Sequence, residues 1–91
     1  MQKLGAVILT ESDFTFNSAY ILYILKNSLS SYLPSGATYV SAVVNGTNGY
    51  HCLTPDKRSN AFYIQGSYWN GNTWVKIDGN ATFTVCLLYT L

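Results

Sequence analysis

Turns rich in glycine and asparagine recur at short intervals through the second half of the chain, and this spacing limits what the chain can fold into. Residues 45–49, 70–72 and 78–80 are the clearest of these turns. Asparagine and glycine tolerate the positive φ angles that tight turns need. The segments between the turns are short and alternate apolar with polar residues, as strands do. We therefore expect a mostly β chain, a compact, jelly-roll-like antiparallel β-sandwich of five to seven strands forming a single domain over residues 1–91.

The final segment shows this alternation clearly. One face of a strand over residues 82–91 would carry Phe83, Val85, Leu87, Tyr89 and Leu91, and the other would carry Thr82, Thr84, Cys86, Leu88 and Thr90. Residues 39–45 predict a similar strand, in which Val40, Ala42 and Val44 oppose Tyr39, Ser41 and Val43. Residues 45–49 then predict a hairpin into residues 50–54. The charged stretch 55–60 predicts an exposed loop.

The first third of the chain is less regular. Residues 4–10 form a continuous apolar run, which indicates a strand buried on both faces, inside the domain or against a neighbour. Residues 17–33 place apolar side chains at helical spacing and end at Pro34, so a short helix near residues 18–33 is our first interpretation. Residues 20–25 also have strong β propensity, so a strand is the alternative.

Composition excludes several classes of protein. Only 10% of the residues are charged and 48% are hydrophobic, so we expect part of the surface to be covered by other subunits. The net charge is +1 and the cations are scattered, which argues against nucleic-acid binding. The longest apolar run, residues 20–25, is too short to span a bilayer, so we expect no membrane insertion.

Side chains for catalysis are scarce. His51 is the single histidine, and on a strand its side chain would point away from the adjacent Cys52. Cys86 would have to approach His51 across the sheet, and no third group orients such a pair. The chain offers too few ligands for zinc or calcium, apart from an ion shared between subunits. We expect no enzyme activity, no metal site and no cofactor, and a disulfide between Cys52 and Cys86 stays open.

Aromatic residues make up 15% of the chain, more than a small core needs. If a two-residue loop at 70–71 or 71–72 closes the hairpin, Trp69, Trp74 and Tyr63 share one face. A three-residue loop would pair Trp74 with Tyr68 instead. In the first case the aromatic face lies outward beside polar residues, a mixture suited to stacking on sugar rings or to packing on another protein.

The order of features from residue 33 to residue 91 resembles the C-terminal head domains of bacteriophage tail fibres and related virion appendage proteins. The features are Pro34, Ser35 and Gly36 leading into a β segment, the aromatic hairpin of residues 63–74, and the apolar β segment 82–89. The resemblance implies a homotrimeric β-sandwich whose distal loops contact a host surface, often a glycan. It also implies possible contacts, which are Tyr50, His51, Trp69 and Trp74; Tyr63 joins them by its position on the aromatic face.

Three functions are compatible with these features. The leading hypothesis is a non-enzymatic tail-fibre tip, located in the virion after assembly in the host cytoplasm, that binds a host receptor or glycan as a homotrimer. The second is a purely structural virion protein that decorates a capsid or joins parts of a tail, bound to other virion proteins. The third is a monomeric carbohydrate-binding module.

Overall fold

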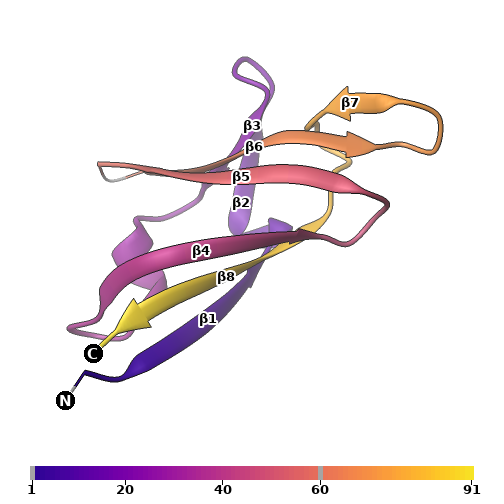
Figure 1. Cartoon of the computed structure of the whole chain (residues 1–91). Coiled ribbons are helices and arrows are strands. Elements are labelled where there is room, and N and C mark those ends of the chain that lie inside the picture. Colours follow the sequence, from indigo (N-terminus) through magenta and orange to yellow (C-terminus); the bar gives the residue numbers. More distant parts are fainter. Residues whose placement is uncertain (1, 60) are drawn as a thin grey trace.

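A three-stranded antiparallel sheet forms one layer of the molecule. The computed structural model describes residues 2–59 and 61–91. In it, β8 (Phe83–Thr90) is the central strand between β1 (Leu4–Thr10) and β4 (Thr38–Gly46). Figure 1 shows that the two chain ends lie together at one end of this sheet.

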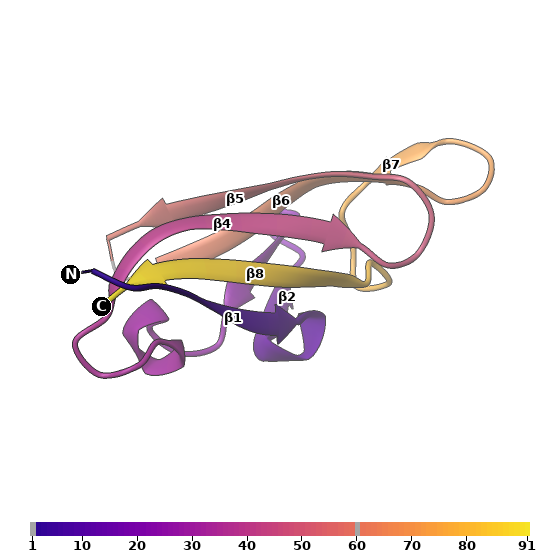
Figure 2. The same cartoon turned by 60° about the horizontal axis from the view of Figure 1, so that its bottom comes forward.

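A second antiparallel sheet forms the other layer, as Figures 1 and 2 show. Its strands in spatial order are β2 (Phe14–Asn17), β3 (Leu22–Leu25), β6 (Ala61–Trp69) and β5 (His51–Arg58). A short strand, β7 (Trp74–Lys76), also pairs with β6. Two 3-10 helices, η1 (Glu11–Asp13) and η2 (Leu29–Tyr32), lie in the connections. The expected mostly β, two-sheet antiparallel architecture is confirmed, with eight strands in the described part of the chain.

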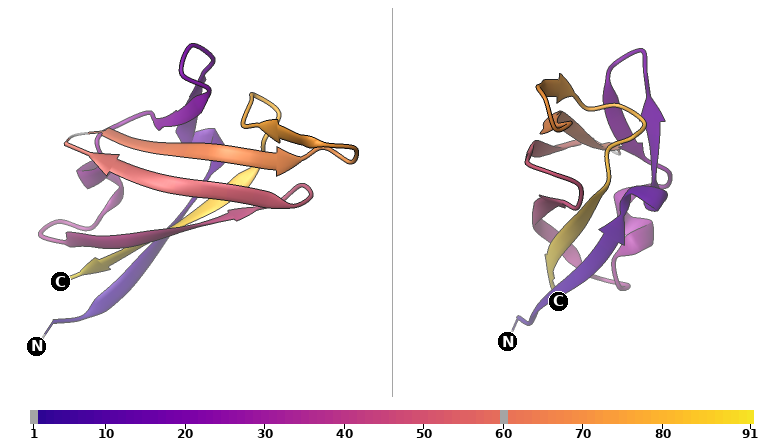
Figure 3. Two further views of the ribbon diagram at one scale, coloured as in Figure 1. Left: turned by 45° about the horizontal axis from the view of Figure 1, so that its top comes forward. Right: turned by 90° about the vertical axis from the view of Figure 1, so that its right-hand side faces the viewer.

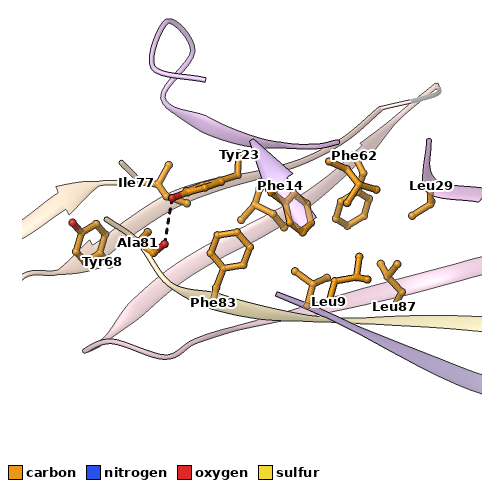
Figure 4. Close-up of a cluster of buried hydrophobic side chains, with 13 residues drawn as sticks. Leu9, Phe14, Tyr23, Leu29, Phe62, Tyr68, Ile77, Ala81, Phe83 and Leu87 are labelled. Atoms are coloured by element: carbon orange, nitrogen blue, oxygen red, sulfur yellow. Dashed lines mark hydrogen bonds between the residues drawn. The ribbon is translucent and has the colours of Figure 1, made fainter. Parts of the chain in front are cut away.

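Inward-facing side chains of both sheets form the core (Figure 4). Its fully buried large members are Phe62, Ile64, Ile77, Phe83, Val85 and Leu87. Phe83 is central, because its ring meets Phe14 at 5.5 Å and Tyr23 at 5.0 Å between centroids, both edge to face. These pairs hold the two sheets together, since each is worth about 0.5–1.5 kcal/mol beyond the burial of apolar area.

The opposite side of the three-stranded sheet faces outward, and we call it the β1–β8–β4 outer face. The register of the three strands arranges the side chains of this face in four rows across the sheet. Each row contains one residue from β1, one from β8 and one from β4. The rows are Leu4, Thr90 and Thr38; Ala6, Leu88 and Ser41; Ile8, Cys86 and Val43; and Thr10, Thr84 and Asn45. The double-sided burial expected for residues 4–10 is therefore wrong for this single chain, because Leu9 is buried whereas Leu4 and Ile8 are exposed.

β4 departs from simple alternation. Its register with β8 shifts between Tyr39 and Ser41, so that Val40 is an extra residue in the strand. The bulge turns Val40 outward, where it is 51% exposed, and Tyr39 packs against the core with Ala42 and Val44. The faces predicted for Val40 and Tyr39 were wrong, because a bulge reverses the alternation on one side of it.

The helix predicted over residues 18–33 is wrong, and its strand alternative is confirmed. β2 and β3 form a hairpin, and the following residues contain only the single-turn helix η2. Tyr23 and Leu25 are buried and alternate with the half-buried Leu22 and Ile24, so the pairing in the sheet outweighs the helical spacing. Within the described residues, no helix is long and apolar enough to cross a bilayer.

Two loop predictions also need correction. Residues 45–49 do precede a strand, but β4 and β5 belong to different sheets, so the turn joins the layers and does not close a hairpin. The charged stretch 55–60 lies mostly within β5, which extends to Arg58. Pro55 is compatible with a strand there because β5 is at the edge of its sheet.

The two cysteines lie on different sheets. Cys52 is exposed on β5 and Cys86 is half-buried on β8, and both are free thiols. Each faces away from the core, Cys86 on the β1–β8–β4 outer face. The disulfide left open by the sequence does not form in this structure.

Candidate functional site

Trp69 and Trp74 lie opposite each other on β6 and β7, on the outer face of the second sheet. Their rings meet edge to face with centroids 5.9 Å apart. Trp69 is half-buried and Trp74 is 50% exposed. Because Tyr68 and Ile77 point into the core, the pairing predicted from alternation is confirmed.

Four residues separate β6 from β7, and the Asn70 N–H donates to the Thr73 carbonyl oxygen at 3.2 Å, so Gly71 and Asn72 form the tip, as in the expected two-residue loop at 71–72. Asn70 organises it, because its side-chain oxygen accepts hydrogen bonds from the backbone N–H groups of Asn72 and Thr73, both at 2.9 Å. Gly71 has a φ of 107°, which disfavours other residues. The observed register, with Trp69 opposite Trp74, is the one that a two-residue loop at 71–72 gives.

Tyr50 extends this pair toward β5. Its carbonyl oxygen accepts a hydrogen bond from the Trp69 N–H at 2.8 Å, and its side chain is 74% exposed. The close approach depends on Gly49, because a Cβ there would lie 2.7 Å from the Trp69 carbonyl oxygen. Tyr50, Trp69 and Trp74 therefore come from three adjacent segments at one end of the sheet, and we call them the aromatic row.

Polar side chains occupy the middle of the same sheet face. Cys52, Ser67 and Lys76 pair across β5, β6 and β7, and Thr54 pairs with Gln65 in the next position along. Hydroxyl, amide and ammonium groups thus lie directly beside the aromatic row. Such groups can donate hydrogen bonds to the hydroxyl groups of a sugar and accept hydrogen bonds from them.

Tyr63 lies at the far end of this face, six residues from Trp69 along β6, which corresponds to a span of about 20 Å. It pairs with Asp56 on β5, and Asp56 forms an ion pair with Arg58 at 2.7 Å. The Arg58 guanidinium lies 5.8 Å from the centroid of the Tyr63 ring. This end of the face is therefore aromatic and charged.

Two adjoining depressions follow this face. One of about 270 Å³ is lined by Tyr20, Leu22, Ile24, Asp56, Arg58, Tyr63 and Gln65. The other, of about 380 Å³, shares Tyr20 and Gln65 with the first and reaches Lys76 on β7. Together they form a groove, which we call the sheet groove. Figure 3 shows the tip of the β2–β3 hairpin and β7 rising on the same side of β5 and β6.

The tip of the β2–β3 hairpin holds Tyr20 over this groove in a strained backbone. Ile21 has a φ of 52°, which is unfavourable for a β-branched residue. The preceding turn is fixed by Asn17, whose side-chain oxygen accepts from the Ala19 N–H and whose carbonyl oxygen accepts from the Tyr20 N–H. Strain of this kind often marks functional segments, and here it carries a tyrosine that is 73% exposed.

His51 lies apart from the aromatic row. It points to the inner side of β5, where its ring stacks on Tyr68 at 5.7 Å. Its Nδ1 lies 3.1 Å from the Gly49 carbonyl oxygen, and its Nε2 lies 3.0 Å from the side-chain oxygen of Asn48. The imidazole is therefore engaged in holding the loop between β4 and β5, and a direct contact with a ligand on the outer face would need it to leave these partners.

The acidic residues are engaged in local structure. Asp13 accepts from the Thr10 N–H and Glu11 from the Phe83 N–H. Asp78 accepts from the Tyr68 hydroxyl at 2.8 Å, and this hydrogen bond, together with burial, raises the pKa of Tyr68 above its ordinary value. Among residues 2–59 and 61–91, no group of three or more His, Cys, Asp or Glu side chains is placed to hold a metal ion.

Of the five residues predicted as contacts, the structure brings Tyr50, Trp69 and Trp74 together, places Tyr63 farther along the same face, and separates His51 from them. The sequence did not indicate Tyr20, because its position depends on a hairpin that was interpreted as a helix. No protein-family model, curated protein or solved structure matches the chain.

Proposed function

We propose that the chain is a non-enzymatic recognition module that binds carbohydrate on the outer face of its second sheet, in a virion appendage of the tail-fibre head type. The tail-fibre setting rests on the resemblance of residues 33–91. The carbohydrate ligand rests on the site itself, and a host-surface glycan is the ligand class that joins the two.

One observation carries the proposal: aromatic side chains lie at both ends of a sheet face whose middle is polar. Trp69 and Trp74 offer ring surfaces at one end and Tyr63 at the other, and the sheet groove with Tyr20 and Gln65 lies between them. Aromatic rings pack on the apolar faces of sugars, and polar groups fix the orientation of a ligand. The span of about 20 Å suits an extended oligosaccharide better than a single sugar.

Intrinsic tryptophan fluorescence can report ligand binding at this site. The chain has two tryptophans, and both belong to the aromatic row. A glycan array would select the ligand, and a titration of tryptophan fluorescence would then measure its dissociation constant. Failure of every glycan to bind or to change the fluorescence would refute carbohydrate recognition.

Substitutions of Trp69 distinguish the loss of ring stacking on a sugar from a general loss of folded protein. Trp69→Ala should raise the dissociation constant about 10-fold to 30-fold, since a tryptophan that anchors a binding site typically contributes about 2 kcal/mol. Trp74 remains as the reporter in that variant. Trp69→Phe keeps a ring and should lose less, and Lys26→Ala, an exposed change away from the groove, should leave binding unchanged.

A second candidate is a purely structural virion protein, and the exposed β1–β8–β4 outer face favours it, because such a surface suits burial against a neighbour. Retention in assembled particles without any glycan binding would support this role. A monomeric carbohydrate-binding module is the third candidate, and it would bind glycan while sedimenting as a single chain.

A further inference from the structure

The β1–β8–β4 outer face exposes more apolar surface than a folded single chain requires. Leu4 is 70% exposed, Ile8 63%, Val40 51% and Val43 49%. All four belong to the two outer strands of this sheet, and Ile8 and Val43 flank the half-buried Cys86 of the central strand. A contiguous apolar surface of this kind usually marks an interface.

This face is also free of charge. None of the twelve residues in its four cross-strand rows is Asp, Glu, Lys, Arg or His. A copy of the same face can therefore approach it without repulsion between like charges. The other sheet, in contrast, carries Asp56, Arg58 and Lys76 on its outer face.

The charged residues at the two ends of β1 also leave this face uncharged. Lys3 directly precedes the strand and Glu11 directly follows it, so strand alternation assigns both to the core side of the sheet, as it does Val7 and Leu9. The Glu11 carboxylate accepts a hydrogen bond from the Phe83 N–H.

The size of the face fits a modest dimer. From the rise per residue and the spacing of strands, it measures about 23 Å by 14 Å. Stacking two such faces, with the side chains that surround them, buries about 1,000 Å² in total, near the lower limit for a specific interface. The dimer should therefore dissociate on dilution.

We propose that two copies of this chain stack their β1–β8–β4 outer faces in a symmetric dimer. Each β8 then lies over the β8 of the other copy, as in sheet-on-sheet packing. The groove on the other sheet stays open in both copies. This contact does not depend on the proposed carbohydrate binding, and it differs from the homotrimer that the tail-fibre resemblance implies.

Sedimentation velocity over a range of concentrations tests the contact. The wild-type chain should form a dimer, and Ile8→Lys should weaken it about 100-fold or more, because two-fold symmetry places two unpaired lysines in the interface. Val43→Lys should do the same. The matched control is Tyr20→Lys, which adds a lysine at an equally exposed position on the other sheet and should leave the dimer intact.

Cysteine cross-linking tests which faces meet. The two Cys86 thiols should lie within about 10 Å of each other, too far for a disulfide but within reach of a short bifunctional maleimide. Cys52→Ser, which retains Cys86, should yield covalent dimers. Cys86→Ser, which retains Cys52 on the opposite side of the molecule, should not.

Four results would overturn the proposal. They are a wild-type chain that stays monomeric at about 100 μM, where a dimer with a dissociation constant of about 10 μM is mostly formed, a trimer, a dimer that persists in Ile8→Lys, and equal cross-linking of the two cysteine variants. Far-UV circular dichroism verifies that each variant is folded. Tryptophan fluorescence keeps the two proposals separate, because a monomeric Ile8→Lys should still bind any glycan at its single site.

Discussion

Gly46 and His51 form a pair whose energetic coupling can be measured. A Cβ at position 46 would overlap the His51 ring. Gly46 does not have a positive φ, so its backbone accepts alanine and only the ring opposes it. Gly46→Ala should therefore force the imidazole away from Tyr68, Asn48 and the Gly49 carbonyl.

The magnitudes follow from these contacts. His51→Ala removes two hydrogen-bonded contacts and one ring stack at a half-exposed position, which should destabilise the chain by about 1–2 kcal/mol. Gly46→Ala should lose much of the same energy and regain about 0.5–1 kcal/mol, because alanine is less flexible than glycine in the unfolded chain. The net destabilisation should be about 1 kcal/mol.

In the His51→Ala background, the same Gly46→Ala substitution should stabilise the chain. The overlap is gone, so only the gain of about 0.5–1 kcal/mol remains. The coupling energy of the double-mutant cycle should thus be about 1.5–2 kcal/mol.

Urea denaturation at low micromolar concentration, followed by circular dichroism and tryptophan fluorescence, measures all four proteins of the cycle. A destabilisation of 1 kcal/mol should move the midpoint by about 0.5–1 M urea. If Gly46→Ala has the same effect with and without His51, the two positions are independent and the packing of this ring on Gly46 is refuted.

Two further predictions concern the core. Phe83→Ala should lower the free energy of unfolding by about 3–5 kcal/mol, because it empties a fully buried site and removes two aromatic contacts; a loss below 1 kcal/mol in urea denaturation would contradict the central position of this ring. Tyr68 has a raised pKa in the folded state, so its contribution to stability is complete below the unfolded value of about 10 and is lost as the pH rises through the folded value. Tyr68→Phe should therefore be less stable than wild type at pH 8 yet show a smaller decline as the pH rises above about 10. If the free energy of unfolding of the two proteins falls equally with pH, the hydrogen bond from Tyr68 to Asp78 does not cause the pH dependence.

Alternation within single strands was predictable from the sequence. Phe83, Val85 and Leu87 point inward as expected, and so do Phe62 and Ile64, because side chains on a strand alternate irrespective of its partners. The aromatic pairing of the tryptophans was predictable for the same reason. The choice between a two-residue and a three-residue loop was not, since asparagine and glycine suit both, and the structure has Gly71 and Asn72 at the tip.

Features that depend on tertiary contacts were not predictable. The apolar residues of 17–33 fit a helix by spacing, and only pairing with β2 and β6 makes Tyr23 and Ile24 a strand. The same error concealed Tyr20, whose place over the sheet groove exists only once the hairpin forms. The bulge at Val40 has no local signal either, because valine suits a regular strand equally well.

Pro55 affects whether another chain can add a strand to the edge of the second sheet. The Trp69 N–H bonds to the Tyr50 carbonyl, so odd-numbered residues of β5, including Pro55, direct their backbone N–H and carbonyl groups to the open edge. Proline has no N–H, and another chain that added a strand there would find a missing donor in mid-edge. Edge-to-edge extension of this sheet into a fibril is therefore obstructed at β5.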